Sequence, residues 1–328
     1  MKTVAFFDNK GGGGRSTLVY HLAHMFAEQG EQTLAVDLDP QSNLTAMCLS
    51  EEALERLWPD TPAHPQTVLG CVQPLLCGIG DVATAHVEEL ADGIGLVAGD
   101  QGLSAFEDRL SDAWPRALNR DASAFRTLSA FYRLIVAAAR DRGASMVLID
   151  VGPNLGAINR AALLAADAIV TPLAPDMFSM QGLRNLGPTL IRWRDMWRDR
   201  LDRRPDLALE LPLGAMQPLG YVVMQVGMRL NRPVKTYQRW IGRMPAEFHQ
   251  AVLRDDERPA STGDDPWCLG IMRHNQSLMP LAQDAQKPMF QLKPADGAIG
   301  CHMDVVRRCR EDFKGLASQV MMRATRSS

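Results

Sequence analysis

A run of glycines between two basic residues stands near the start of the chain. Residues 10–17 read Lys-Gly-Gly-Gly-Gly-Arg-Ser-Thr and follow an apolar run at residues 4–7. The phosphate-binding template G-x-x-x-x-G-K-[ST] uses glycines to let backbone N–H groups approach the phosphates, a Lys to reach the β and γ oxygens, and a hydroxyl to bind Mg²⁺. The run therefore predicts a phosphate loop in which Arg15 stands at the usual Lys position.

Each residue of this loop has a predicted role. Gly11, Gly12 and Gly14 remove Cβ atoms, so that N–H groups and the following helix N-terminus can face anionic phosphates. Ser16 is a predicted Mg²⁺ ligand, and a role as helix cap fits the same position. A simple glycine-rich turn is the alternative for the loop as a whole. The residues predicted to contact the nucleotide here are Lys10, Gly11, Gly12, Gly13, Gly14, Arg15, Ser16 and Thr17.

Acidic residues follow two other apolar runs. Asp37 and Asp39 lie at the carboxyl end of residues 33–40, and Asp150 closes residues 145–150. Open α/β sheets bind ligands at the carboxyl ends of their strands, so these acids are predicted to lie near the phosphate loop. A carboxylate at the position of Asp150 can hold Mg²⁺ through water. Asp37 points the same way as Asp39 by strand alternation, and a solvated loop is the alternative for this pair.

Apolar runs of strand type alternate with amphipathic runs of helix type along the chain. This order predicts an α/β fold with a doubly wound, mostly parallel sheet flanked by helices. Strands are expected at 4–7, 33–40, 94–98, 145–150, 168–172, 219–224 and 268–271, and helices at 18–30, 103–110, 124–142, 159–166, 181–201 and 303–322.

The remaining segments are predicted to be insertions within this fold. Prolines divide residues 46–90 into short pieces, which indicates a helical excursion. Residues 202–212 and 255–266 are hydrophilic and contain prolines, so they are expected to be surface loops.

Composition narrows the class of protein. The chain has 328 residues, 46% of them apolar, which is enough for a large core. No apolar stretch reaches about 18 residues and no signal peptide opens the chain, so a cytoplasmic location is predicted. The six cysteines lack C-x-x-C spacing, which argues against a zinc site. A formal charge of −3 excludes an overall basic coat for nucleic acid but leaves a local basic patch open.

Several stretches in order point to one family. Residues 10–17 resemble the deviant Walker A loop, KGGxGK[ST], of the ParA/MinD ATPases, closest to the ParA partition ATPase-like proteins. Residues 36–43 resemble their second-strand motif, residues 147–153 their Walker B and switch II, and residues 172–183 their P-x-x-P-[ED]-x-[FY]…G-L segment. The resemblance spans the chain and implies one ParA-like P-loop domain over residues 1–328.

The resemblance implies ATP and Mg²⁺ as cofactors and a homodimer with ATP sandwiched at its interface. Lys10 would reach the nucleotide of the partner, Asp39 would position the attacking water, and Asp150, with Ser16 and Asp39, would serve the metal. Such a cation supplied in trans raises phosphoryl-transfer rates by about 10³ to 10⁵. Met224, Gln225, Met272 and Arg273 occupy adenine-side positions of the family, and core packing is the alternative for both methionines.

Arg15 leaves the predicted activity open. Lys carries a compact point charge on a flexible stem, whereas Arg carries a wide planar fork. Three outcomes compete: slow or absent hydrolysis with nucleotide binding retained, ordinary turnover, and loss of all nucleotide binding. The first outcome corresponds to a second function, in which the chain is a nucleotide-binding scaffold or regulator of a partner protein with little or no hydrolysis.

Two basic segments are candidates for the nonspecific DNA binding that the resemblance implies. Residues 184–204 carry seven Arg against three Asp, and residues 229–243 carry basic residues and no acid. A solvated helix face with i,i+4 ion pairs is the alternative for both. The second segment is preferred, and its predicted DNA contacts are Arg229, Arg232, Lys235, Arg239 and Arg243.

The biological setting is also only implied. The family uses such switches to position DNA or protein cargo, with an activating or cargo protein that the sequence does not identify and a possible association with the nucleoid. No membrane partner is expected, because residues 321–328 lack the pattern of a surface-seeking amphipathic helix.

Overall fold

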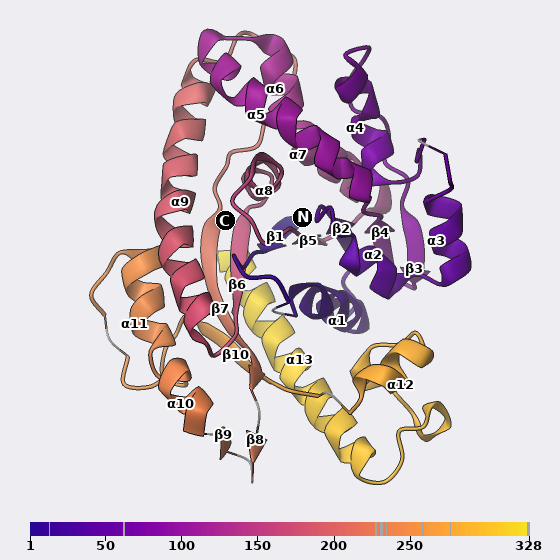
Figure 1. The fold of residues 1–328 in the computed structure, drawn as a ribbon, viewed down its shortest axis with the longest axis vertical. Helices are drawn as coiled ribbons and strands as arrows, with labels where there is room; N and C mark the ends of the chain where they lie inside the picture. The colour runs from indigo at the N-terminus through magenta and orange to yellow at the C-terminus, as the bar shows by residue number, and fades with distance from the viewer. Residues whose placement is uncertain are drawn as a thin grey trace.

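An eight-stranded sheet organises the chain (Figure 1). The computed structural model describes residues 1–12, 14–61, 63–226, 228–229, 232–233, 235–257, 259–275 and 277–326, and within 225–236 it describes the backbone alone. The strand order is β10-β7-β6-β1-β5-β2-β4-β3, and β3 is antiparallel to β4 while the other neighbours pair in parallel. The strands are β1 Lys2–Phe6, β2 Thr33–Asp37, β3 Glu88–Ala91, β4 Ile94–Val97, β5 Met146–Asp150, β6 Ala168–Leu173, β7 Gln217–Val226 and β10 Cys268–Arg273. The predicted fold class, a mostly parallel sheet flanked by helices, is confirmed.

The register of the central strands aligns their carboxyl ends. Phe6 of β1 and Asp37 of β2 both pair with Asp150 of β5. The segments that leave β1 and β2 therefore emerge beside Asp150, at one edge of the sheet. Parallel pairing is what makes this possible, because parallel strands bring their carboxyl ends to the same edge.

Helices cover both faces of the sheet. Val4 and Phe6 of β1 pack with α1 (Arg15–Glu28) and α13 (Cys301–Arg326) in one buried cluster. Ala5 and the following Phe7 point to the opposite face, which is covered by α5 (Phe106–Arg116), α6 (Ala122–Leu128), α7 (Ala130–Arg142) and α8 (Ala157–Leu164). This alternation follows from the strand pleat, which turns successive side chains to opposite faces.

The other helices extend these layers. The long helix α9 (Met177–Asp202) runs along one side of the molecule (Figure 1). Against α9 lies a π-helix, η3 (His249–Leu253), and the approach is so close that a Cβ on Gly187 would lie 1.8 Å from the Ala251 carbonyl oxygen. The remaining α-helices are α2 Asn43–Cys48, α3 Glu51–Leu57, α4 Val68–Cys77, α10 Lys235–Ile241, α11 Met244–Phe248 and α12 Met279–Asp284.

Several segments differ from the prediction, among them α10, α11, η3 and α12, for which no helix was predicted. Residues 46–90 contain α3 and α4, as expected, but they also lead into β3, a short edge strand that was not predicted because it has four residues and two of them are Glu. The helix expected at 124–142 is two helices, α6 and α7, separated at Ser129. The Ser129 hydroxyl donates to the Phe125 carbonyl at 2.7 Å, a bond that competes with the regular helical ladder.

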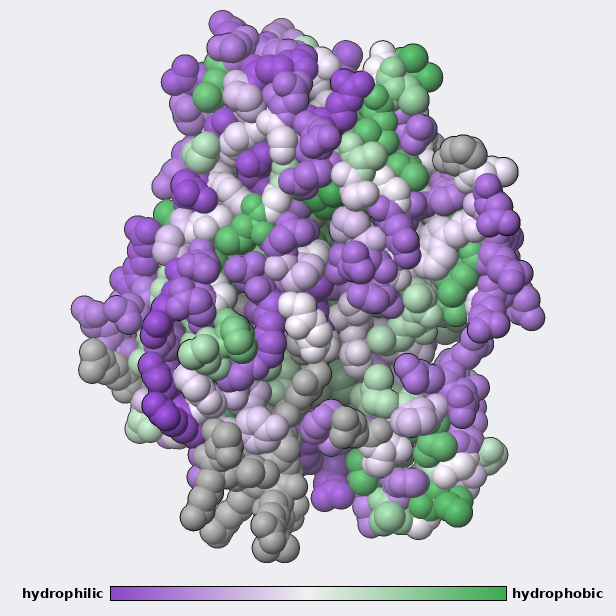
Figure 2. Space-filling view, viewed as in Figure 1, coloured by the Kyte–Doolittle hydropathy of each residue, from purple (hydrophilic) through white to green (hydrophobic). Residues whose placement is uncertain are grey.

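The outer surface seen in Figure 2 is mostly hydrophilic, with apolar residues gathered over α4 and in the region of α12. Residues 203–212, and the described part of 255–266, contain neither helix nor strand. In the part of the chain that is described, no helix has the length and apolarity needed to cross a membrane.

Candidate functional site

The glycine run forms the connection between β1 and α1 at the carboxyl edge of the sheet. Gly12 and Gly14 have φ values of 74° and 81°, in the left-handed region that disfavours residues with a Cβ. Gly14 is the N-cap of α1, and its carbonyl accepts from the Leu18 N–H at 2.9 Å. The first N–H groups of α1 therefore face the loop, where a helix N-terminus favours an anion. Gly13, also predicted here, lies outside the described residues.

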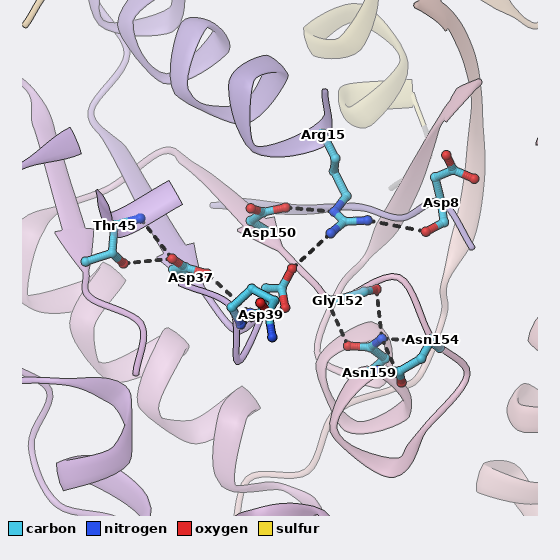
Figure 3. Close-up of polar contacts among 10 residues, drawn as sticks. Asp8, Arg15, Asp37, Asp39, Thr45, Asp150, Gly152, Asn154 and Asn159 are labelled. Carbon is cyan, nitrogen blue, oxygen red and sulfur yellow. Dashed lines mark hydrogen bonds and ion pairs between the residues drawn. The ribbon is translucent and has the colours of Figure 1, made fainter. Parts of the chain in front are cut away.

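Arg15 points inward and joins three segments of the site (Figure 3). Its Nε donates to Asp150 Oδ1 at 2.9 Å, and its Nη2 donates to Asp39 Oδ2 at 3.1 Å. Its Nη1 donates to the Asp8 carbonyl oxygen at 3.3 Å. The side chain is 8% exposed, and its two acidic partners are buried. Charge-assisted bonds of this kind are about twice as strong as neutral ones, so they fix the guanidinium between the two carboxylates.

Burial raises the pKa of three acids at this site, Asp150, Asp37 and Asp8. It raises the pKa of Asp150, and the positive charge of Arg15 and the Ser16 hydroxyl act in the opposite direction. Burial and the nearby Asp150 raise the pKa of Asp37 to about 8. Asp8, in the segment between β1 and the glycines, has its pKa raised to about 7 by burial, against the charges of Arg15 and Lys10. The site therefore takes up protons near neutral pH, which limits the negative charge that it presents to a phosphate.

Asp37 supports the position of Asp39. Asp37 accepts the Thr45 N–H and hydroxyl at 2.9 and 2.7 Å, and its other oxygen accepts the Asp39 N–H at 3.2 Å. The side chain of Asp37 thus turns to the start of α2, while that of Asp39 turns to Arg15. The two acids were expected to point the same way, and the bend after β2 separates them.

Lys10 is paired within its own chain. Its Nζ forms an ion pair with Asp176, which also caps α9 by accepting the Ser179 N–H at 2.9 Å. Although burial raises the pKa of Asp176, the bonds from Lys10 and the cap lower it overall. No partner was predicted for Asp176, but its place just after β6, at the same edge of the sheet, is a signal that it faces the loop.

A further positioning residue, Asn159, was missed from the sequence. Its amide donates to the carbonyls of Gly152 and Asn154 at 2.8 and 2.6 Å, and it accepts the Gly152 N–H at 3.1 Å (Figure 3). A Cβ on Gly152 would lie 3.2 Å from Asp39 Oδ1, so this loop packs directly against the site. A buried Asn at the start of a helix just after a strand-end acid is the sequence signal for such a clamp.

Two cavities border the loop. One, of about 310 Å³, is lined by the predicted adenine-side residues Met224, Met272 and Arg273 together with Gly14 and Thr17. Both methionines are buried within the core cluster on this face of the sheet, so the packing alternative also stands. The side chain of Gln225 lies outside the described residues. The other cavity, of about 540 Å³, opens between α1, α2 and α12.

The predicted metal ligands do not fit Mg²⁺ in this arrangement. Mg²⁺ prefers carboxylate and hydroxyl oxygens in octahedral geometry. Asp39 and Asp150 each already give one oxygen to Arg15, and Asp39 Oδ1 accepts the Gln41 N–H at 3.0 Å. Asp150 Oδ2 is buried without a hydrogen-bond partner. A cation, the guanidinium, therefore already stands where the predicted ion would bind.

The basic segments differ from each other. In residues 184–204, Arg200 is buried over Trp114 and donates to its carbonyl at 2.8 Å, and Arg203 pairs with Asp199 at 2.9 Å. These contacts favour a structural role for much of that segment. Arg239 and Arg243 are exposed beside Trp240, and Arg243 pairs with Glu247 at 3.5 Å. The side chains of Arg229, Arg232 and Lys235 lie outside the described residues.

Comparison with known proteins agrees with the predicted family and fold. A family model described as an AAA domain matches residues 1–202. The chromosome partitioning protein ParA of Caulobacter vibrioides is 29% identical over 204 residues, which is 62% of this chain and 67% of that protein.

Solved structures extend the likeness over the whole chain. The protein DIP2308 from Corynebacterium diphtheriae is 27% identical, with a TM-score of 0.72 over 100% of both chains. The ATP complex of a Cyanothece McdA variant shares the fold at 17% identity, with a TM-score of 0.63 over 98% of this chain and 96% of that one. The chain belongs to the AAA domain family and is a P-loop ATPase relative of the ParA/MinD type.

Proposed function

We propose that the chain binds ATP at the loop of residues 10–17 and uses it as a dimerisation switch. The observation that carries this proposal is the continuity of the site. The loop and the N-terminus of α1 can receive phosphates, and the 310 Å³ cavity that shares Gly14 and Thr17 with them can receive a base. Residues 1–328 would act as one unit in this function.

Lys10 is the proposed dimer contact. Its ammonium group is half-buried at the edge of the loop and is held by Asp176, from which an incoming phosphate can release it. Lys10→Ala is expected to retain measurable ATP binding and to lose ATP-dependent dimerisation, because the charge that reaches the partner's nucleotide is gone. Size exclusion with ATP and Mg²⁺ measures the dimer fraction.

Lys314→Ala, on the exposed side of α13, is the matched control for a lost ammonium group. An unchanged dimer fraction in Lys10→Ala, with the control also unchanged, would refute the assignment of Lys10.

The geometry of Arg15 favours a second candidate, a nucleotide-binding scaffold or regulator with little or no hydrolysis. Asp39, the residue proposed to position water, is engaged by Arg15 at 3.1 Å. Phosphate release by the natural chain and by Arg15→Lys separates the two candidates. Turnover in both proteins supports the ATPase switch, whereas turnover only in Arg15→Lys supports the scaffold.

We also propose that the switch controls nonspecific DNA binding in partition or cargo positioning, in the cytoplasm or on the nucleoid. Exposed Arg239 and Arg243 support a basic surface near α10 and α11. If four to six basic residues contact phosphates, the logarithm of the affinity is expected to fall with the logarithm of salt with a slope of about −4 to −5. A flat salt dependence would remove DNA from the proposal and leave the unidentified activating or cargo protein as the partner.

A further inference from the structure

The guanidinium of Arg15 occupies the position between two carboxylates where a metal ion would be expected. Its Nε and Nη2 donate to Asp150 and Asp39 at 2.9 and 3.1 Å, from elements 135 and 24 residues away along the chain. A divalent cation bound to the same oxygens would lie against the fixed positive charge of Arg15. Two cations that compete for one pair of carboxylates repel each other strongly in a buried site.

The guanidinium of Arg15 has more N–H donors than its protein partners use. Arginine carries five N–H groups in a planar fork. Asp150, Asp39 and the Asp8 carbonyl each accept one of them, which leaves two N–H groups, one on each Nη, without an acceptor among these partners. Arg15 also lines the larger cavity beside the loop. The same side chain can thus hold both carboxylates and an anionic oxygen, which is the bridging role that a metal ion plays between acidic residues and phosphates.

A lysine could not make the same bridge. Its ammonium group has three donors on one atom and binds as a point charge. With Lys at position 15, at least one of Asp39 and Asp150 would be free to accept a metal ion. The choice of Arg therefore changes how the site neutralises the carboxylates.

We propose that this chain binds a nucleoside di- or triphosphate without a divalent metal ion, with Arg15 as the cation that joins Asp39 and Asp150 to a phosphate oxygen. This inference rests on the proposed nucleotide site. It concerns binding, so it holds whether or not the bound nucleotide is hydrolysed.

The test is the metal dependence of binding by the natural protein. Titration calorimetry with ADP and with the non-hydrolysable analogue AMPPNP gives the Kd in Mg²⁺ and again in EDTA. The two Kd values are expected to agree within about threefold, less than the tenfold that corresponds to about 1.4 kcal/mol. A larger gain in affinity with Mg²⁺ overturns the proposal. Absence of binding in both buffers overturns the nucleotide site itself, and with it this inference.

A variant assigns the effect to Arg15. Arg15→Lys is expected to bind AMPPNP at least about tenfold more tightly in Mg²⁺ than in EDTA, because its carboxylates are free for the ion. Circular dichroism checks that the variant is folded, and the exposed Arg204→Lys is the matched control with the natural ratio. If folded Arg15→Lys keeps the ratio of the natural protein, the assignment to Arg15 is wrong. If the variant does not fold, the two-buffer titration of the natural protein alone decides.

Discussion

Two clusters in this molecule place a buried basic side chain between two carboxylates, and they differ in where the carboxylates come from. Arg15 lies between Asp39 and Asp150. His249 lies between Asp255 and Asp265, at 2.6 and 3.3 Å. The partners of Arg15 stand 24 and 135 residues away, whereas those of His249 stand 6 and 16 residues away.

The surroundings of Arg15 and His249 also differ. Arg15 lines a cavity of about 540 Å³ and keeps donors for a ligand. His249 is 1% exposed, and Asp265 is satisfied further by the Tyr221 hydroxyl and the Trp267 N–H at 2.7 and 2.9 Å. The His249 cluster therefore closes a loop onto β7, while the Arg15 cluster joins strand ends around a site. Arg15 borders a cavity and keeps N–H donors that its protein partners do not use, so its ion pairs can also serve a ligand.

The largest expected effect comes from removing the cation of the site. Arg15→Ala leaves Asp39 and Asp150 buried without their cationic partner, and breaking such a buried pair costs about 3–5 kcal/mol of unfolding free energy. The loss is expected to be smaller at pH 5 than at pH 8, since burial raises the pKa of Asp150 and protonation can neutralise its unpaired carboxylate. Urea unfolding at the two pH values measures the difference. An equal loss at both values would mean that packing, not charge, explains the role of Arg15.

A smaller effect is expected in the closed cluster. His249→Gln is expected to cost about 2 kcal/mol at pH 6, the scale of hydrogen bonds to charged groups, and to leave the Kd for AMPPNP unchanged. Nucleotide affinity that falls with this variant would contradict the separation of the two clusters.

The same variant tests the pH dependence. Burial alone would lower the pKa of His249. Its hydrogen bonds to the carboxylates of Asp255 and Asp265 have the larger combined effect, so the pKa is raised. A raised folded pKa contributes stability that is complete below the unfolded value and is lost as pH rises through the folded value. The stability difference between the natural protein and His249→Gln is therefore expected to shrink between pH 6 and pH 9. A difference that stays constant would show that His249 is neutral throughout.

The smallest effect is expected at an exposed pair. Arg243 lies on the surface and reaches Glu247 at 3.5 Å, while Arg184 also pairs with Glu247. Arg243→Ala is expected to change the unfolding free energy by less than about 1 kcal/mol, because exposed ion pairs are screened by water and salt. Thermal unfolding measures this, and a larger loss would show that the acid-free segment is structural.

Much of the fold could be predicted from the sequence. The strands β1, β2, β5 and β6 consist mostly of apolar residues, as expected of parallel strands buried on both faces, so their type was clear. β3 was missed because a four-residue edge strand with two Glu carries little pattern. The break at Ser129 was missed because apolar spacing continues through it, and the bond from its hydroxyl to Phe125 depends on local geometry.

The sequence by itself determined the family, the glycine loop that follows β1, and the strand-end positions of Asp39 and Asp150, because motif spacing and the alternation of apolar and amphipathic runs are local properties of the chain. The tertiary structure decided which partners each charge takes. Lys10 pairs with Asp176, and Arg15 pairs with both Asp39 and Asp150. A charge that is removed from water must be paired with an opposite charge. The carboxylates nearest to Lys10 and Arg15 follow or end strands that are far apart in sequence, so only the folded chain brings these pairs together.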